Sequence, residues 1–182
     1  MANILIAGCG YIGTALGSLL AAEGHTVWGL RRHPDTLPPD VRPFGADLTS
    51  PETLQTLPPT VDWVFYTAAP DSHDDVAYQA VYVEGVRNLL HALTCQQVRP
   101  RRVFLTSSTG VYGESSGAWV DETSPTKPPE FSGIQLLQGE RRDDSTGRGR
   151  YRPSGARANH QTPRRRFPHA RPARPLVPAH PG

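Results

Sequence analysis

The chain has 182 residues, of which 37% are apolar and 20% charged, and its formal net charge is +2. This length suffices for one domain with a core of its own, and two cysteines without metal-ligand spacing exclude a disulfide framework and a cysteine-based metal site. Since no run approaches the ~18 apolar residues of a membrane span, we expect a cytoplasmic protein with no metal and no membrane partner.

Residues 3–32 are expected to form a strand, a glycine turn, a helix and a second strand. The apolar run 4–7 is typical of a short parallel strand that is buried on both faces. Glycines then follow in GxGxxG spacing: Gly8, Gly10 and Gly13. This spacing allows a tight turn, close backbone approach to a phosphate and close packing of a helix, so it predicts dinucleotide binding. An ordinary structural turn is the alternative.

The helix after this turn is expected to begin at Tyr11 and Ile12, where apolar residues recur at helical spacing, and to end at Gly24. The free N–H groups of its first turn would point at a bound pyrophosphate, because the positive end of the helix dipole lies there. We therefore expect Tyr11 and Ile12 to form the cofactor site together with the glycines.

The second strand, residues 25–30, is followed by Arg31 and Arg32. In dinucleotide-binding units an acidic residue at this point accepts from the ribose 2′-hydroxyl of NAD, whereas arginine can pair with a 2′-phosphate. The two arginines therefore favour NADP as the cofactor, with NAD as the other possibility. Alternatively, both arginines are solvated surface residues.

A third strand is expected over residues 40–46, and Asp47 follows it. Because this strand end would lie beside the adenine, Asp47 could accept a hydrogen bond from the adenine amino group. It could equally start the next turn. Ser50 and Pro51 then suit the cap and the first position of a helix.

Ala68 and Ala69 follow a fourth strand over residues 61–67, and they offer small side chains where the backbone would approach a cofactor. The longest helix is expected over residues 74–93. Its apolar residues form a broad stripe that we expect in the core: Val76, Tyr78, Val81, Tyr82, Val86, Leu89, Leu90 and Leu93. A fifth strand over residues 102–107 leads into a cluster of hydroxyl side chains.

This alternation of strands and helices predicts an α/β fold, a Rossmann-type doubly wound parallel sheet of five strands. Ligands of such sheets bind at the carboxyl ends of the strands, where the hydroxyl cluster also lies. Several motifs are added to GxGxxG: the two alanines, GVRNLL at residues 85–90, SSTGVYG at 107–113, VDE at 120–122 and SP at 124–125. On these motifs, residues 3–140 resemble the extended or atypical short-chain dehydrogenase/reductases, the NAD-dependent epimerase/dehydratase family.

The resemblance implies a catalytic Ser or Thr after the fifth strand, a Tyr that acts as acid or base, and a Lys four residues later. Ser108 falls on the serine position, but the Tyr-Lys pair is absent. The sequence has Phe131 or Ser132 in place of the tyrosine and Gln135 or Leu136 in place of the lysine. A helper asparagine in the long helix is replaced by Tyr82. Tyr112 is expected to line the pocket or to substitute as the acid.

By resemblance, the function is that of an NAD(P)-binding oxidoreductase or epimerase-like protein acting on a small-molecule substrate, such as a nucleotide sugar or another carbonyl or hydroxyl compound. Ser108 and Tyr112 would face the nicotinamide. The absent pair leaves a second reading open, that of a non-catalytic dinucleotide-binding module that senses redox state or binds a partner. A homo-oligomer is compatible with either.

The last part of the chain differs in composition. Residues 1–140 hold 8 Lys and Arg against 15 Asp and Glu, whereas residues 141–182 hold 11 Arg against 2 Asp, with 7 Pro and no apolar periodicity. We expect a Rossmann domain over 1–140 and a disordered tail after it. The abrupt change suggests a shifted reading frame and a truncated fold. An arginine-rich arm that binds nucleic acid is a less favoured alternative.

Overall fold

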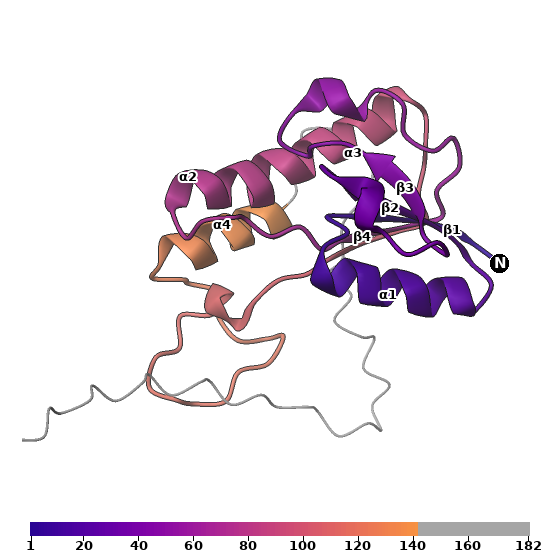
Figure 1. Ribbon diagram of the computed structural model, residues 1–182. Coiled ribbons are helices and arrows are strands. Elements are labelled where there is room, and N and C mark those ends of the chain that lie inside the picture. Colours follow the sequence, from indigo (N-terminus) through magenta and orange to yellow (C-terminus); the bar gives the residue numbers. More distant parts are fainter. Residues whose placement is uncertain (142–182) are drawn as a thin grey trace, which may run out of the picture.

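Residues 1–141 are described in the computed structural model, and within them five strands form one parallel sheet (Figure 1). In chain order the strands are β1 (Asn3–Ala7), β2 (Thr26–Arg31), β3 (Arg42–Gly45), β4 (Trp63–Tyr66) and β5 (Arg102–Leu105). Their order across the sheet is β3-β2-β1-β4-β5, and every neighbouring pair is parallel. This confirms the predicted doubly wound α/β fold. The predictions for the tail, disorder and a shifted frame, concern residues 142–182, which lie outside the described residues.

β1 is the central strand, and both of its faces are buried. Ile4 and Ile6 lie in one hydrophobic cluster, whereas Leu5 and Ala7 lie in the other, and all four are fully buried. Successive side chains of a strand point to opposite faces, so one short apolar run supplies both cores.

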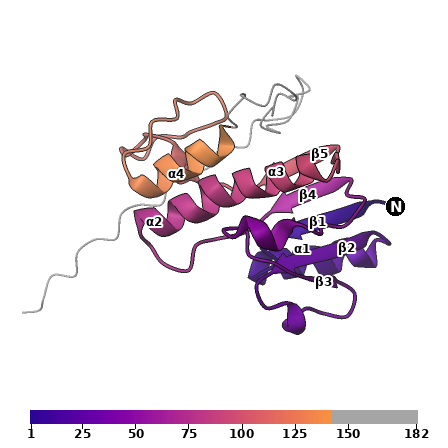
Figure 2. The same cartoon turned by 90° about the horizontal axis from the view of Figure 1, so that it is seen from above.

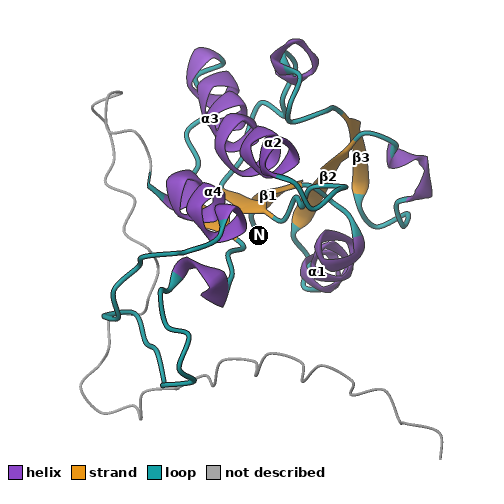
Figure 3. Ribbon diagram, turned by 90° about the vertical axis from the view of Figure 1, so that its left-hand side faces the viewer, coloured by secondary structure: helices purple, strands orange, loops and turns teal. Residues whose placement is uncertain are grey.

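The two cores are covered by different helices (Figure 3). Among the described residues, α1 (Tyr11–Ala22) lies on one face, and the other face carries α2 (Asp75–Tyr78), a π-helical segment (Gln79–Gly85) and α3 (Val86–Cys95). These three segments form one long rod, and α4 (Phe131–Glu140) packs beside its α2 end (Figure 2). Single 3₁₀ turns lie at Pro34–Thr36, Pro51–Leu54 and Thr109–Val111. None of the described helices is both long and apolar enough to cross a bilayer.

The helix predicted over residues 74–93 is continuous, but its middle is π-helical. The Tyr66 hydroxyl, from β4, donates to the Val81 carbonyl at 2.5 Å. Gly85 leaves room for it, because a Cβ there would lie 2.5 Å from the phenol oxygen. Side chains inserted into a helix hydrogen-bond ladder are a known cause of such irregularity. The predicted apolar stripe assumed a single α-helical register through the whole helix. For Val76 the prediction of a core position is wrong, since this side chain is 77% exposed.

The ends of the smaller elements depend on local backbone chemistry. Gly24 has φ +84 and ends α1 as predicted, since glycine adopts the left-handed region without strain. Ser50 precedes a single 3₁₀ turn, and its side chain makes no cap hydrogen bond; its carbonyl instead accepts from Thr53 Oγ1 at 2.7 Å. The predicted side-chain cap is therefore wrong, and the turn is instead closed by the Ser50 carbonyl, which also accepts from the Thr53 N–H at 3.0 Å.

Candidate functional site

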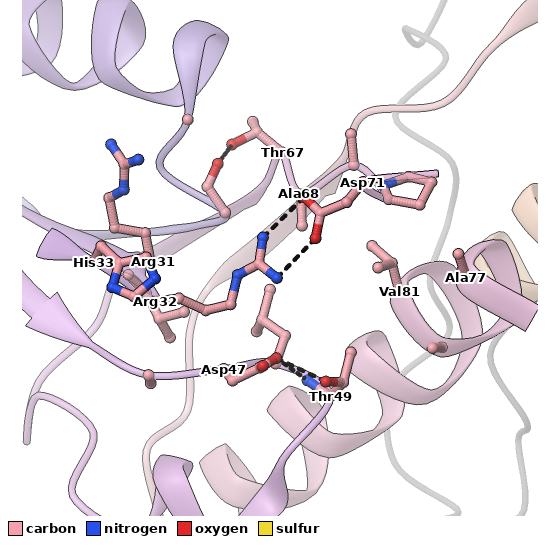
Figure 4. A pocket seen from close by; sticks show the side chains of 18 of the residues that line it. Arg31, Arg32, His33, Asp47, Thr49, Thr67, Ala68, Asp71, Ala77 and Val81 are labelled. Carbon is pink, nitrogen blue, oxygen red and sulfur yellow. Dashed lines mark hydrogen bonds and ion pairs between the residues drawn. The ribbon is translucent and has the colours of Figure 1, made fainter. Parts of the chain in front are cut away.

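A cavity of about 640 Å³ opens at the carboxyl ends of the central strands (Figure 4). It is lined by the turn after β1, the end of β2, the segment after β3, the segment after β4 and one side of the long helix. Nine of the predicted cofactor residues line it: Gly8, Gly10, Tyr11, Ile12, Arg31, Arg32, Asp47, Ala68 and Ala69. The order of the sheet explains why residues so far apart in the chain meet here, since β2 and β4 both flank β1.

The glycine turn forms one wall of the cavity. Gly8 has φ +86, and a Cβ there would collide with Ala68. The turn is held by hydrogen bonds from the N–H groups of Gly8 and Cys9 to the Leu30 carbonyl, at 3.0 and 2.8 Å. Thr67 adds a bond from its hydroxyl to the Gly8 carbonyl at 2.9 Å. The turn therefore has a fixed shape that other residues could not adopt.

The start of α1 opens into this cavity. Gly10 is its N-cap and contributes no side-chain cap, and the first turn holds no acidic residue. A Cβ at Gly10 would have the Gly8 carbonyl oxygen, at 4.0 Å, as its nearest neighbour, so the space above the helix start is open. First-turn N–H groups that have no partner in the helix attract anions. This arrangement fits the diphosphate of a dinucleotide.

Gly13 does not line the cavity. A Cβ at this position would lie 2.8 Å from Thr67 Oγ1 and 2.9 Å from Ile6 Cγ2. Its place in the GxGxxG motif therefore reflects close packing of α1 on β1 and the end of β4, which is the third role expected of the motif.

The two arginines after β2 are arranged differently. The Arg32 guanidinium and the Asp71 carboxylate form a two-bond ion pair, with Nη1–Oδ2 at 2.7 Å and Nη2–Oδ1 at 2.9 Å. Figure 4 shows the pair spanning the cavity, while the Arg31 side chain, which also lines the cavity, points away from the pair. The hydrogen bonds and charge of Asp71 raise the pKa of Arg32, and those of Arg32 lower the pKa of Asp71.

Asp47 lines the cavity and also shapes the turn after β3. Its Oδ1 accepts from the Thr49 backbone N–H at 2.9 Å and from the Thr49 hydroxyl at 2.8 Å. The turn alternative that the sequence offered is therefore present, and both bonds from Thr49 go to the same carboxylate oxygen. Both expectations for Asp47 are compatible with this geometry.

Ser108 and Tyr112 lie outside the cavity lining. The Ser108 hydroxyl accepts from the Gly110 N–H at 3.1 Å and so caps a 3₁₀ turn.

Tyr112 packs against a small cluster that contains Val111 and Leu136. Burial, followed by the negative charges of Glu140, Glu122 and Asp121, raises the pKa of Tyr112. A phenol in this setting stays protonated at neutral pH, which suits an acid and not a base.

The residues that the resemblance places at the Tyr and Lys positions lie on α4, and none of them lines the cavity. Gln135 is buried, and its Nε2 donates to the Asp75 carboxylate at 2.8 Å, while its Oε1 has no hydrogen-bond partner. Leu136 lies in the cluster with Val111, and Tyr82 packs against that cluster. Phe131 contacts the rings of His73 and Tyr78. In either register, the described part of this region holds no cation in the lysine position.

Sequence reasoning missed three kinds of residue in the site. Asp71 was missed because its significance depends on a partner 39 positions away. Thr67 was treated as the end of a strand, although it holds the glycine turn. Three residues of the long helix also line the cavity: Ala77, Ala80 and Val81. In the sequence, only their small side chains could have indicated that a ligand comes close to the helix here. Within residues 1–141, no group of three or more potential metal ligands comes together.

The fold and this cavity define a protein of the Rossmann type, with a glycine turn at the start of the first helix. Residues 4–133 match the NAD dependent epimerase/dehydratase family, and the chain belongs to that family. This confirms the resemblance based on the sequence motifs.

Three relatives illustrate the match. The chain is 31% identical over 134 residues to a 3 beta-hydroxysteroid dehydrogenase/Delta 5-->4-isomerase of Mycobacterium tuberculosis, covering 67% of this chain and 36% of that protein. An NAD-dependent epimerase/dehydratase structure from Methylobacillus flagellatus is 40% identical with a TM-score of 0.63, covering 76% of this chain and 49% of that one. A short-chain dehydrogenase/reductase superfamily protein from Agrobacterium tumefaciens, with bound NAD, is 29% identical with a TM-score of 0.62, covering 76% and 43%.

The chain thus spans about a third to a half of the length of these relatives. The family's NAD dependence and the NAD-bound neighbour support a nicotinamide dinucleotide as the cofactor class.

Proposed function

We propose that residues 1–140 bind NADP in the cavity at the carboxyl end of the sheet. The observation that carries this proposal is the start of α1, which has no side-chain cap and opens into a cavity of about 640 Å³. Tyr11 and Ile12 would hold the diphosphate through the backbone N–H groups of the first helical turn, and Gly8 and Gly10, whose own N–H groups bond within the turn, would let it approach the backbone closely.

The remaining lining residues would hold the adenosine half. Arg32, with Arg31 behind it, would pair with the 2′-phosphate that distinguishes NADP from NAD. Asp47 would accept from the adenine amino group. Ala68 and Ala69 would let the backbone approach the ribose, since larger side chains there would fill the cavity.

The reaction we propose is that of an oxidoreductase or epimerase on a small hydroxyl or carbonyl compound, such as a nucleotide sugar. The family and the hydroxysteroid dehydrogenase relative support this class. The bound nicotinamide would supply hydride exchange. Ser108 would hydrogen-bond the substrate oxygen, and Tyr112, whose pKa is raised, would hold a proton near neutral pH for donation to that oxygen.

A direct test is to titrate the purified full chain with NADPH and with NADH and to follow binding by calorimetry. Gly10→Ala should weaken NADPH binding about tenfold or more, because its methyl group would stand in the open space at the helix start. Gly45→Ala is the matched control, since its methyl group makes ordinary contact with Pro34 outside the lining. A folded chain that binds neither nucleotide would exclude the proposal.

A second candidate is a dinucleotide-binding module without catalysis. It is favoured by the neutral Gln135 and Leu136 in the lysine registers, because a tyrosine with no adjacent cation is a poor proton acceptor. Incubation with NADPH and a panel of aldehydes and nucleotide sugars separates the two candidates. Nucleotide binding with no turnover of any compound would favour the module.

A further inference from the structure

The ion pair between Arg32 and Asp71 joins two walls of the cavity. Arg32 follows β2, whereas Asp71 belongs to the segment after β4, and the glycine turn after β1 lies between these strands. Both side chains line the cavity, and Figure 4 shows them meeting across it, with Asp47 and Thr49 on one side and Thr67 on the other.

The pair uses the part of Arg32 that a phosphate would need. Two parallel N–H bonds to one carboxylate occupy the fork of a guanidinium, and the same fork is the usual binding geometry for a phosphate. A 2′-phosphate would therefore have to displace Asp71 before it could bind Arg32 in this way. The displaced carboxylate would remain nearby and repel the phosphate.

Arg31 does not relieve this competition. Its side chain points away from the pair (Figure 4), and Asp47 adds a second carboxylate whose charge acts on Arg32. The end of the cavity that would receive a 2′-phosphate therefore carries two acidic groups around the one arginine that faces it. NAD, which has a hydroxyl group at this position, would leave the ion pair intact.

We propose that Asp71 limits the preference for NADP by holding Arg32: it lowers the affinity for NADP and leaves that for NAD unchanged, so that the margin between the two cofactors is smaller than the arginine alone would give. This inference rests on the proposed binding of a nicotinamide dinucleotide in the same cavity. It adds a selecting residue, in a segment remote from the end of β2, to the arginines that the sequence pattern identified.

The test compares NADPH and NADH affinities in the full chain, measured by calorimetry and by the shift in thermal unfolding temperature. Asp71→Asn should raise the NADPH affinity about fivefold, the range of an exposed ion pair, and change the NADH affinity by less than about twofold. Glu23→Gln is the matched control: it removes one negative charge at the far end of α1 and should alter neither affinity.

A second variant shows whether Arg32 mediates the effect. In Arg32→Gln, adding Asp71→Asn should raise the NADPH affinity less than it does in the wild-type background, because no guanidinium remains to be released. An equal gain in both backgrounds, or an equal change for NADPH and NADH, would overturn the proposal while leaving the binding site intact. Loss of binding of both nucleotides by the wild-type chain would overturn the proposed function as well.

Discussion

The hydroxyl of Tyr66 is expected to stabilise the irregular helix, and Tyr66→Phe removes only that hydroxyl. Tyr66 is 2% exposed, so its ring stays packed in the core when the oxygen is lost. The variant leaves the Val81 carbonyl without its donor from β4, at a site where Gly85 had left room for the phenol oxygen. The perturbation therefore isolates one partly buried hydrogen bond.

The expected magnitude follows from the environment of that bond. A buried acceptor that loses its donor destabilises a protein by about 1–3 kcal/mol, and the Val81 carbonyl is partly buried beside a buried phenol, which places it within this range. Taking about 2 kcal/mol and a urea m-value of about 2 kcal/mol/M, the midpoint of unfolding should fall by about 1 M. An m-value equal to that of wild type would show that the variant exposes the same amount of surface on unfolding.

Urea unfolding followed by tryptophan fluorescence and by circular dichroism measures this effect. Tyr82→Phe is the control, because Tyr82 is half-buried on the same helix and its hydroxyl has no hydrogen-bond partner within residues 1–141. It should shift the midpoint by much less. Equal shifts in the two variants, or no shift in Tyr66→Phe, would show that the hydroxyl does not hold the π-helical segment.

Three further results are expected. Burial raises the pKa of Tyr66 above its unfolded value, so the wild-type free energy of unfolding, fully present below about pH 10, should fall as the pH rises further, and Tyr66→Phe should lessen that fall in urea titrations at graded pH. Gly13→Ala should cost about 1–3 kcal/mol, because its methyl group would press on Thr67 and Ile6; a thermal unfolding temperature equal to that of wild type would contradict this packing. Asp74→Ala should lower the urea midpoint, since the Asp74 carboxylate caps α2 by accepting from the Ala77 N–H at 2.9 Å, whereas Asp74→Asn should keep a midpoint close to that of wild type, because asparagine caps helices about as well; equal losses in both variants would contradict the cap.

The sheet could be predicted from the sequence because each strand is a short apolar run bounded by turn residues. The glycine turn was equally predictable, since GxGxxG is a local pattern. The structure adds what the pattern does not record: the side chains excluded at Gly8 and Gly13 would meet Ala68 and Thr67, which lie far along the chain. Nine of the ten residues predicted for the cofactor line one cavity for the same reason: parallel strands end at a common edge.

The remaining features depend on contacts between distant segments. The Arg32–Asp71 pair joins two loops, so neither residue alone indicates it. The π-helical segment depends on a phenol oxygen from β4, which no periodicity within the helix records. α4 was not predicted, because two glycines interrupt FSGIQLLQGE, and glycine is unfavourable inside a helix. The structure shows why they are there: Gly139 packs closely on Tyr82 of the long helix, and Gly133 packs on Gly110.

The layering of the sheet has a consequence for motion. Within residues 1–141, α1 is the only helix on its face of the sheet. The hydrophobic core between α1 and the sheet is smaller than the core on the opposite face. The helix should therefore open as a local unit at a lower free energy than the opposite layer, and its amide hydrogens should exchange with solvent sooner. An anion held by its first turn would slow that exchange along the whole helix, so isotope uptake in α1 would report occupancy of the cavity.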